Sequence, residues 1–131
     1  MSKRDERIVE SVSVHPLAGQ RVRACDYPDL EEIKEAYNKT IPCMDEPAQR
    51  VSFGTSGHRG KATDGSFTAL HVGSVVQAIC NLRQSFGASG PVFVGADTHY
   101  LSQLAYQTTL NVLAYNKIAA CTDCEGDFVP T

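Results

Sequence analysis

Three glycines, at positions 54, 57 and 60, lie in the short segment 54–60, which also carries two hydroxyl side chains, a histidine and an arginine. Glycine at this density allows sharp turns and lets the backbone approach another molecule closely. The preceding Val51-Ser52-Phe53 alternates between apolar and polar residues, which predicts the end of a strand. The segment therefore predicts a tight loop that follows a strand.

The polar side chains of this loop are suited to binding an anion such as phosphate. Thr55 and Ser56 supply hydroxyls, and Arg59 supplies a planar guanidinium with paired N–H donors. The loop is not a P-loop, because Lys61 is followed by Ala62, and its glycines are spaced too evenly for a dinucleotide-binding turn. A purely structural turn with a solvated arginine remains the alternative.

The order of the predicted elements indicates an α/β fold with a mostly parallel, mixed sheet in a three-layer α/β/α arrangement. We expect strands at residues 51–53, 91–95 and 118–121. We expect helices from Leu30 to about Asn38, from Thr68 to about Phe86, and from Ser102 to about Tyr115.

Apolar spacing predicts the buried face of each longer helix. In the second helix the stripe comprises Val72, Val75, Val76, Ile79, Leu82 and Phe86. In the third it comprises Leu101, Leu104, Ala105, Thr108 and Val112, widened by Leu110 and Leu113. Asp29 and Thr68 are expected to cap helices, and His71 is expected at the surface or in a cap.

Ligands of open α/β sheets lie beyond the carboxyl ends of the strands. Residues 54–61, 96–101 and 122–131 are expected there. The second of these loops offers Asp97, Thr98 and His99. Asp97 can orient His99 or Arg59, but we favour the ordinary role, in which Asp97 and Thr98 satisfy the turn and begin the helix.

Composition excludes several classes of protein. The net charge of −3 gives no overall positive field for nucleic acid. No run approaches the roughly 18 apolar residues that span a bilayer, and no apolar stretch of a signal peptide follows the charged N-terminus. We therefore expect a cytoplasmic location, with neither nucleic acid nor membrane as a partner.

The five cysteines are irregularly spaced, which argues against a secreted disulfide framework. Cys121 and Cys124 form a lone C-x-x-C pair, with no second pair to complete a zinc site and no helical pattern after it. We expect reduced thiols, and a cysteine-based redox or zinc module stays open as an alternative.

The segment Phe53-Gly54-Thr55-Ser56-Gly57-His58-Arg59-Gly60 resembles the first active-site loop of the α-D-phosphohexomutases, and most of all the bacterial phosphoglucomutases specific for α-D-glucose phosphates. Residues 18–20, 47–51, 91–99 and 127–131 extend the resemblance. It implies an incomplete first domain over residues 47–131, preceded by an arm, a short helix and a linker over residues 1–46.

Members of that family interconvert glucose 1-phosphate and glucose 6-phosphate through a phosphoserine and glucose 1,6-bisphosphate, which also acts as activator. Mg²⁺ neutralises charge during the transfer. By similarity, Arg59 would stabilise the phosphate of the sugar-phosphate substrate, and Thr55, Ser56 and His58 would shape its pocket. Whether His58 carries a proton or donates a hydrogen bond stays open. The family often has a basic residue where Ala96 stands, which argues against a ligand role for the second loop.

Three other family motifs do not occur in this sequence. These are the Ser-His-Asn nucleophile, the Asp-x-Asp-x-Asp metal loop and the Glu-x-Ser-Gly sugar loop. We therefore expect an N-terminal part of a phosphoglucomutase, without a catalytic residue or metal ligand of its own, inactive alone and partnered by the remaining domains. The alternative is a small non-catalytic α/β module that binds a phosphate-bearing ligand or a partner protein through Gly54–Lys61.

Overall fold

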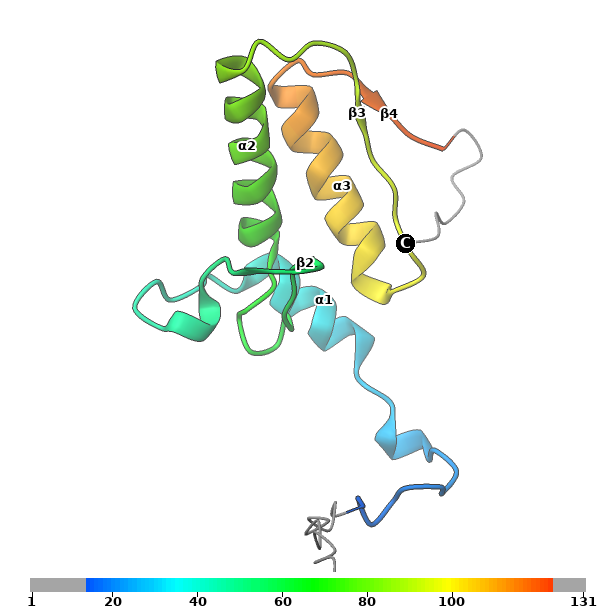
Figure 1. The fold of residues 1–131 in the computed structure, drawn as a ribbon. Helices are drawn as coiled ribbons and strands as arrows, with labels where there is room; N and C mark the ends of the chain where they lie inside the picture. Colours follow the sequence, from blue (N-terminus) through cyan, green and yellow to red (C-terminus); the bar gives the residue numbers. More distant parts are fainter. Residues whose placement is uncertain (1–13, 124–131) are drawn as a thin grey trace, which may run out of the picture.

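The computed structural model describes residues 14–123. Along the chain lie η1 (Ala24–Asp26), α1 (Leu30–Lys39), η2 (Pro47–Gln49), β1 (Phe53–Gly54), β2 (Gly57–His58), α2 (Ala69–Ser85), β3 (Val92–Phe93), α3 (Tyr100–Tyr115) and β4 (Ala120–Cys121). Helices α2 and α3 lie side by side, with α1 near their N-terminal ends and the β3–β4 pair along α3 (Figure 1). The arrangement is α/β, as the sequence predicts.

Helix α1 begins where its cap predicts. The Asp29 carboxylate accepts hydrogen bonds from the backbone N–H groups of Glu31 and Glu32, at 2.9 and 3.2 Å. The inner face carries Tyr37, which is only 1% exposed. Its hydroxyl lies 2.9 Å from Oγ1 of Thr108 on α3, so a hydrogen bond joins the two helices.

Helix α2 has the predicted bounds within a residue, but its buried face differs from the predicted stripe. Val76 and Cys80 are buried, whereas Ile79, Leu82 and Phe86 are 43%, 55% and 81% exposed. The reason is the position of α3, which packs on the Val76 side of α2. No described residue covers the other side of the last two turns.

Helix α3 begins at Tyr100, two residues before the predicted start, because His99 caps it. Of the predicted inner face, Leu101 and Leu113 are buried, and the remaining members are half-buried. Lys117, just after the helix, has a φ of 57°. This left-handed residue turns the chain back toward β4.

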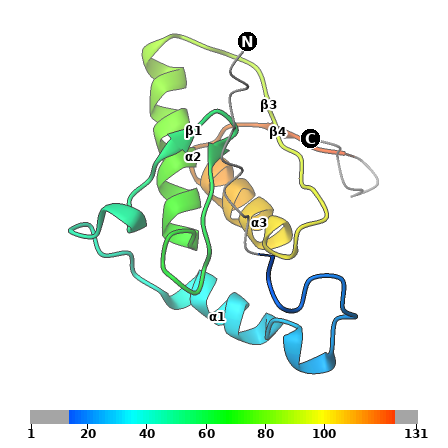
Figure 2. The ribbon, with the colours of Figure 1, turned by 60° about the horizontal axis from the view of Figure 1, so that its bottom comes forward.

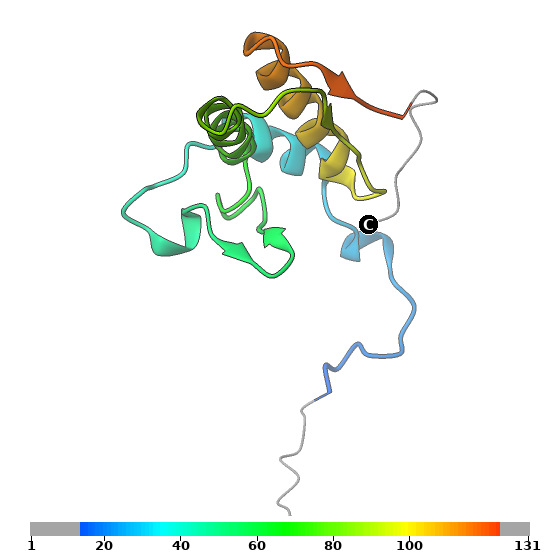
Figure 3. The ribbon, with the colours of Figure 1, turned by 45° about the horizontal axis from the view of Figure 1, so that its top comes forward.

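The strands form two separate pairs among residues 14–123. β3 and β4 are parallel, with Val92 opposite Ala120 and Phe93 opposite Cys121, and α3 is the crossover between them. β1 and β2 instead form an antiparallel hairpin with Phe53 opposite His58. The expectation that segment 51–53 joins the parallel sheet is therefore wrong for the described chain. Figure 3 shows the hairpin set apart from β3 and β4.

The hairpin forms because its turn is very short. Gly54 pairs with Gly57, which leaves only Thr55 and Ser56 at the tip. Gly57 has a φ of +96°, in the left-handed region that favours glycine. The chain therefore reverses at once and pairs with itself.

Two apolar clusters hold the helices together. The α1-side core has Tyr37, Ala62 and Leu101 at its centre and joins α1, the loop after the hairpin and the start of α3. The sheet-side core has Val76, Cys80 and Leu113 at its centre, with Val92 of β3 and other half-buried residues against it.

Residues 14–28 lie outside these cores. All of them are exposed, and their trace runs away from the helices in Figure 3. In Figure 1, β2 and α1 lie at the same end of the α2–α3 pair, and Figure 2 shows α1 beside the N-terminal ends of both helices. Across residues 14–123, no helix combines the length and apolar character needed to cross a membrane.

Candidate anion-binding cleft

The turn that follows the hairpin fixes the backbone beside Arg59. The Asp64 carboxylate accepts hydrogen bonds from the backbone N–H of Ser66, at 3.0 Å, and from its hydroxyl. These bonds hold the pKa of Asp64 below its usual value, with the hydroxyl as the larger cause. At Gly60, a Cβ would come within 2.6 Å of the Ser66 carbonyl oxygen. Only glycine fits there without displacing backbone.

The imidazole of His58 anchors the hairpin to its surroundings. Its Nε2 lies 2.9 Å from the Ser66 carbonyl oxygen, and its Nδ1 accepts from the backbone N–H of Ser52 at 3.2 Å. The ring stacks on Phe67 and on His71, with centroid separations of 5.8 and 5.1 Å. Both ring nitrogens are therefore engaged with backbone.

His71 and Gln49 support the hairpin from behind. His71 is 3% exposed, so the surface option for it was wrong and the capping option is confirmed. Its Nδ1 accepts from the backbone N–H of Thr68 at 3.1 Å, and its Nε2 donates to the Gln49 carbonyl at 2.8 Å. The Gln49 side chain accepts from Cys43 N–H and donates to the Asp64 carbonyl. Three separate segments are thereby tied together.

Across from the hairpin, the loop after β3 and the start of α3 form a second wall. The Asp97 carboxylate accepts from the backbone N–H of His99 at 2.9 Å and from the hydroxyl of Ser102. These two bonds, the hydroxyl first, lower the pKa of Asp97. His99 in turn accepts from the backbone N–H of Leu101 at 3.2 Å. For Asp97, the favoured role in the turn is confirmed.

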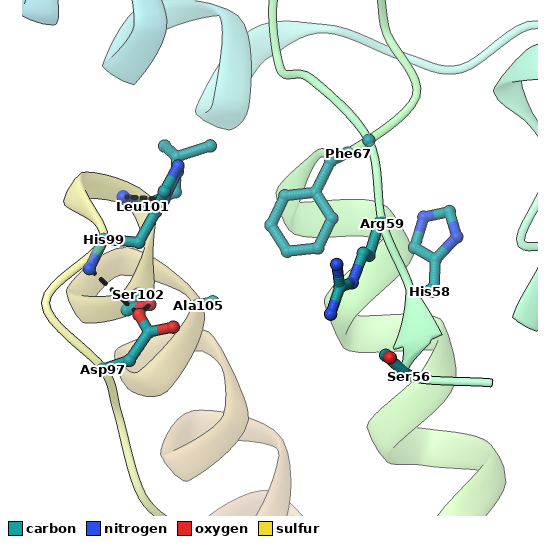
Figure 4. A pocket seen from close by; sticks show the side chains of 10 residues that line it. Ser56, His58, Arg59, Phe67, Asp97, His99, Leu101, Ser102 and Ala105 are labelled. Carbon is teal, nitrogen blue, oxygen red and sulfur yellow. Dashed lines mark hydrogen bonds between the residues drawn. The ribbon is translucent and has the colours of Figure 1, made fainter. Parts of the chain in front are cut away.

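A cleft of about 510 Å³ lies between the two walls. Its lining comprises Ser56, His58, Arg59, Gly60, Phe67, Asp97, His99, Leu101, Ser102 and Ala105. Figure 4 shows the hairpin residues facing the α3 residues across this space. Two loops that are about 40 residues apart in the sequence thus line opposite sides of one cleft.

Arg59 is the cation of the hairpin wall. It is exposed, and its side chain extends toward the space between the walls (Figure 4). No hydrogen bond or ion pair joins its guanidinium to any of residues 14–123. The paired N–H donors can therefore bind a phosphate or carboxylate without first breaking a contact to these residues.

Three of the four predicted site residues meet in the cleft. Ser56, His58 and Arg59 line it, whereas Thr55 at the hairpin tip does not. A part for His71 and Gln49 in supporting the site was not predicted, although both determine where the hairpin lies. The Thr68–His71 spacing matches that of a capping box, but histidine is not the usual residue at its last position.

Residues 14–123 contain no group of three or more histidine, cysteine or carboxylate side chains that could hold a metal ion. Cys121 is exposed. Cys124, the other cysteine of the C-x-x-C pair, lies outside the described residues, as does most of the predicted third loop, residues 122–131.

Comparison with known proteins connects this cleft to an enzyme family. The family model described as phosphoglucomutase/phosphomannomutase, alpha/beta/alpha domain I, matches residues 50–131. A phosphoglucomutase from Komagataeibacter xylinus is 38% identical over 119 residues, which cover 91% of this chain and 21% of that protein. The chain thus spans about a fifth of the length of this relative, and the matched region includes both walls of the cleft.

Proposed function

This chain belongs to the phosphoglucomutase/phosphomannomutase family, and we propose that it supplies the arginine-bearing wall of a sugar-phosphate site. The observation that carries the proposal is Arg59, a guanidinium exposed to a 510 Å³ cleft without a partner among the described residues. Arginine is well suited to phosphate because two of its N–H groups can bond two phosphate oxygens at once.

The neighbouring side chains fit the same ligand. The Ser56 hydroxyl can donate to a phosphate oxygen, while the half-buried Phe67 provides an apolar surface that a sugar ring can contact. His58 holds the strand that carries Arg59, through the Ser52 and Ser66 backbone. In this proposal His58 mainly positions Arg59, and the Thr55 hydroxyl at the tip reaches only a ligand that extends beyond the cleft.

The reaction we propose for the whole protein is the interconversion of glucose 1-phosphate and glucose 6-phosphate. A phosphoserine would donate a phosphoryl group to the monophosphate, and the resulting glucose 1,6-bisphosphate would return the other phosphoryl group to the serine. Arg59 would stabilise negative charge on the phosphate that faces it. The nucleophile would come from another part of the protein, because this sequence has no Ser-His-Asn motif.

Mg²⁺ is the cofactor expected for such a transfer. The described residues do not fit it, since they hold no cluster of suitable ligands. Ligands for the metal would therefore come from another part of the protein. We also propose a cytoplasmic location.

Binding of glucose 1-phosphate to the 131-residue chain tests the site. We expect a dissociation constant of about 1 mM, since only one wall-bound cation engages the phosphate. Arg59→Ala should weaken binding by about tenfold or more, because a hydrogen bond to a charged group contributes about 1.5–3 kcal/mol. Arg59→Lys should recover part of the loss, since it keeps the charge without the paired donors.

Arg21→Ala is the matched control, because Arg21 is exposed and lies outside the cleft. Equal affinities of the Arg59→Ala variant and the unchanged chain would refute the site. A coupled mutase assay with Mg²⁺ and glucose 1,6-bisphosphate should show no turnover by this chain alone. Turnover would mean that a residue of this chain carries the phosphoryl group, and Ser56 would be the first to substitute.

A further inference from the structure

His58 and His71 form a stacked pair of imidazoles behind Arg59. Their ring centroids are 5.1 Å apart, with 24° between the planes. His58 lines the cleft and is half-buried, whereas His71 is 3% exposed. Imidazole is the side chain whose charge ordinarily changes between about pH 5 and 8. The pair therefore places a titratable group beside the proposed phosphate site.

The His58 ring can be bonded in both protonation states without moving. Its Nε2 lies 2.9 Å from the Ser66 carbonyl oxygen, so this nitrogen donates in either state. Its Nδ1 lies 3.2 Å from the backbone nitrogen of Ser52 and 3.1 Å from the Ser52 carbonyl oxygen. The neutral ring accepts the Ser52 N–H at Nδ1, and a protonated ring donates to the Ser52 carbonyl instead.

His71 does not have this freedom. Its Nε2 donates to the Gln49 carbonyl, and its Nδ1 accepts the backbone N–H of Thr68. A protonated Nδ1 could donate a hydrogen bond to the Thr68 hydroxyl, 3.0 Å away, but the buried Thr68 N–H would then lose its acceptor. The charge would also lie at the N-terminus of α2, where the helix dipole is already positive. Proton uptake by the pair is therefore assigned to Nδ1 of His58.

Both signs of charge surround His58. The titratable or charged groups on the elements around it are Arg59, Lys61, Asp64, His71, Asp97 and His99. Asp64 and Asp97 are each engaged by a serine hydroxyl and a backbone N–H. Arg50, which precedes the hairpin, donates to the Met44 carbonyl. Arg59 is therefore the nearest charged residue along the chain.

We propose that anion binding in the cleft is coupled to proton uptake on Nδ1 of His58, which acts as a second, pH-dependent cation beside Arg59. This rests on the proposed function, because it takes the cleft as the phosphate site. A bound dianion offsets the repulsion between the two cations, and by linkage the protonated ring strengthens binding of the dianion. The pair would favour dianionic phosphate monoesters over singly charged anions.

Sulfate is the probe, because it stays a dianion throughout the range in which phosphate itself titrates. Backbone amide shifts of residues 55–60 can follow potassium sulfate binding to the full chain at constant ionic strength. We expect binding about three- to tenfold tighter at about pH 5.5 than at about pH 8, as for one added charge in a solvated cleft. His58→Gln should bind with the same affinity at both pH values.

His15→Gln is the matched control, because His15 is exposed and outside the cleft, and it should keep the full pH dependence. The His58 ring of the unchanged protein provides a second measurement that does not depend on a variant folding. Sulfate added at about pH 6.5 should move its Cε1–H resonance toward the protonated position.

Sulfate binding with equal affinity at both pH values would overturn the coupling and leave the phosphate site intact. If His99→Gln lost the pH dependence and His58→Gln kept it, the proton would belong to His99 on the α3 wall. That result would also overturn the proposed coupling. Absence of binding by sulfate and by glucose 1-phosphate at every pH would overturn the proposed function itself.

Discussion

The β1–β2 hairpin and the parallel β3–β4 pair are equally short, with two residues in each strand, yet different interactions hold them in place. The hairpin is held by the hydrogen bonds that His58 makes with the Ser52 and Ser66 backbone, and by a close backbone approach at Gly60 that leaves no room for a Cβ. The parallel pair rests on the sheet-side core, where Val92 packs near Leu113 and Cys80.

This difference separates the geometry of the cleft from the stability of the fold. Directional hydrogen bonds fix the backbone that carries Arg59, whereas apolar burial supplies most of the free energy of folding. Changes in the sheet-side core should therefore lower stability more than they alter the cleft. Changes in the hairpin should affect ligand binding at least as strongly as stability.

The largest effect on stability is expected from Leu113→Ala. Leu113 is 1% exposed at the centre of the sheet-side core, and truncation of such a side chain costs about 2–5 kcal/mol. Urea denaturation measures the loss. Leu82→Ala is the matched control, because Leu82 is 55% exposed, and it should cost less than about 1 kcal/mol. Similar losses for both would show that this core does not hold the parallel pair.

Gly60→Ala should have the next largest effect on stability, and it should also change the cleft. The new methyl group would meet the Ser66 carbonyl oxygen at 2.6 Å, so backbone must shift, at a cost of about 1–3 kcal/mol. Because Arg59 is adjacent, binding of glucose 1-phosphate should also be lost. Gly54→Ala, where no atom lies within 4 Å, should change neither quantity much. Retained binding in Gly60→Ala would mean that the turn does not position Arg59.

Tyr37→Phe tests the contact between helices α1 and α3. Tyr37 packs in the α1-side core and its hydroxyl bonds Thr108 on α3. Removal of this hydroxyl should lower the free energy of unfolding by about 0.5–1.5 kcal/mol, with little change in the binding of glucose 1-phosphate. Tyr115→Phe is the control, since Tyr115 is 85% exposed. A large loss of binding in Tyr37→Phe would show that α1 also shapes the cleft.

The smallest expected effect is on the acid side of the stability profile. The Ser102 hydroxyl and then the His99 N–H lower the pKa of Asp97 from 3.8. The ionised carboxylate therefore stabilises the folded state fully above about pH 3.8, and this contribution is lost as pH falls through the lowered pKa. Ser102→Ala should raise the pKa of Asp97 toward 3.8, which a carboxyl NMR titration would detect. An unchanged pKa of Asp97 in this variant would show that the Ser102 hydroxyl does not lower it.

The helices could be predicted from the sequence because they carry local signals. Asp29 and Thr68 mark the beginnings of α1 and α2, and the glycines from position 87 mark the end of α2. The buried stripe of α2 was predicted less well. Periodicity identifies an apolar face, but burial depends on the neighbour that covers it, and α3 covers the side with Val76 and Cys80.

The strands and the site show a similar limit. Val51-Ser52-Phe53 has the alternation of a strand, but three residues do not specify a partner, and the turn at Gly57 pairs Phe53 with His58. The chemistry of Arg59, Ser56 and His58 could be predicted from the loop, and all three line the cleft; their ligand remains a prediction. The role of His71 depends on contacts with Gln49 and His58 that no local pattern contains.

The crossover between β3 and β4 has a consequence for the order of folding. Val92 and its partner Ala120 are separated by the whole of α3, so their pairing must close a long loop before it gains any hydrogen bond. The hairpin closes over a few residues and has no such delay. During synthesis from the N-terminus, the wall with Arg59 can therefore form first, and the wall with Asp97 and His99 becomes fixed only when α3 docks.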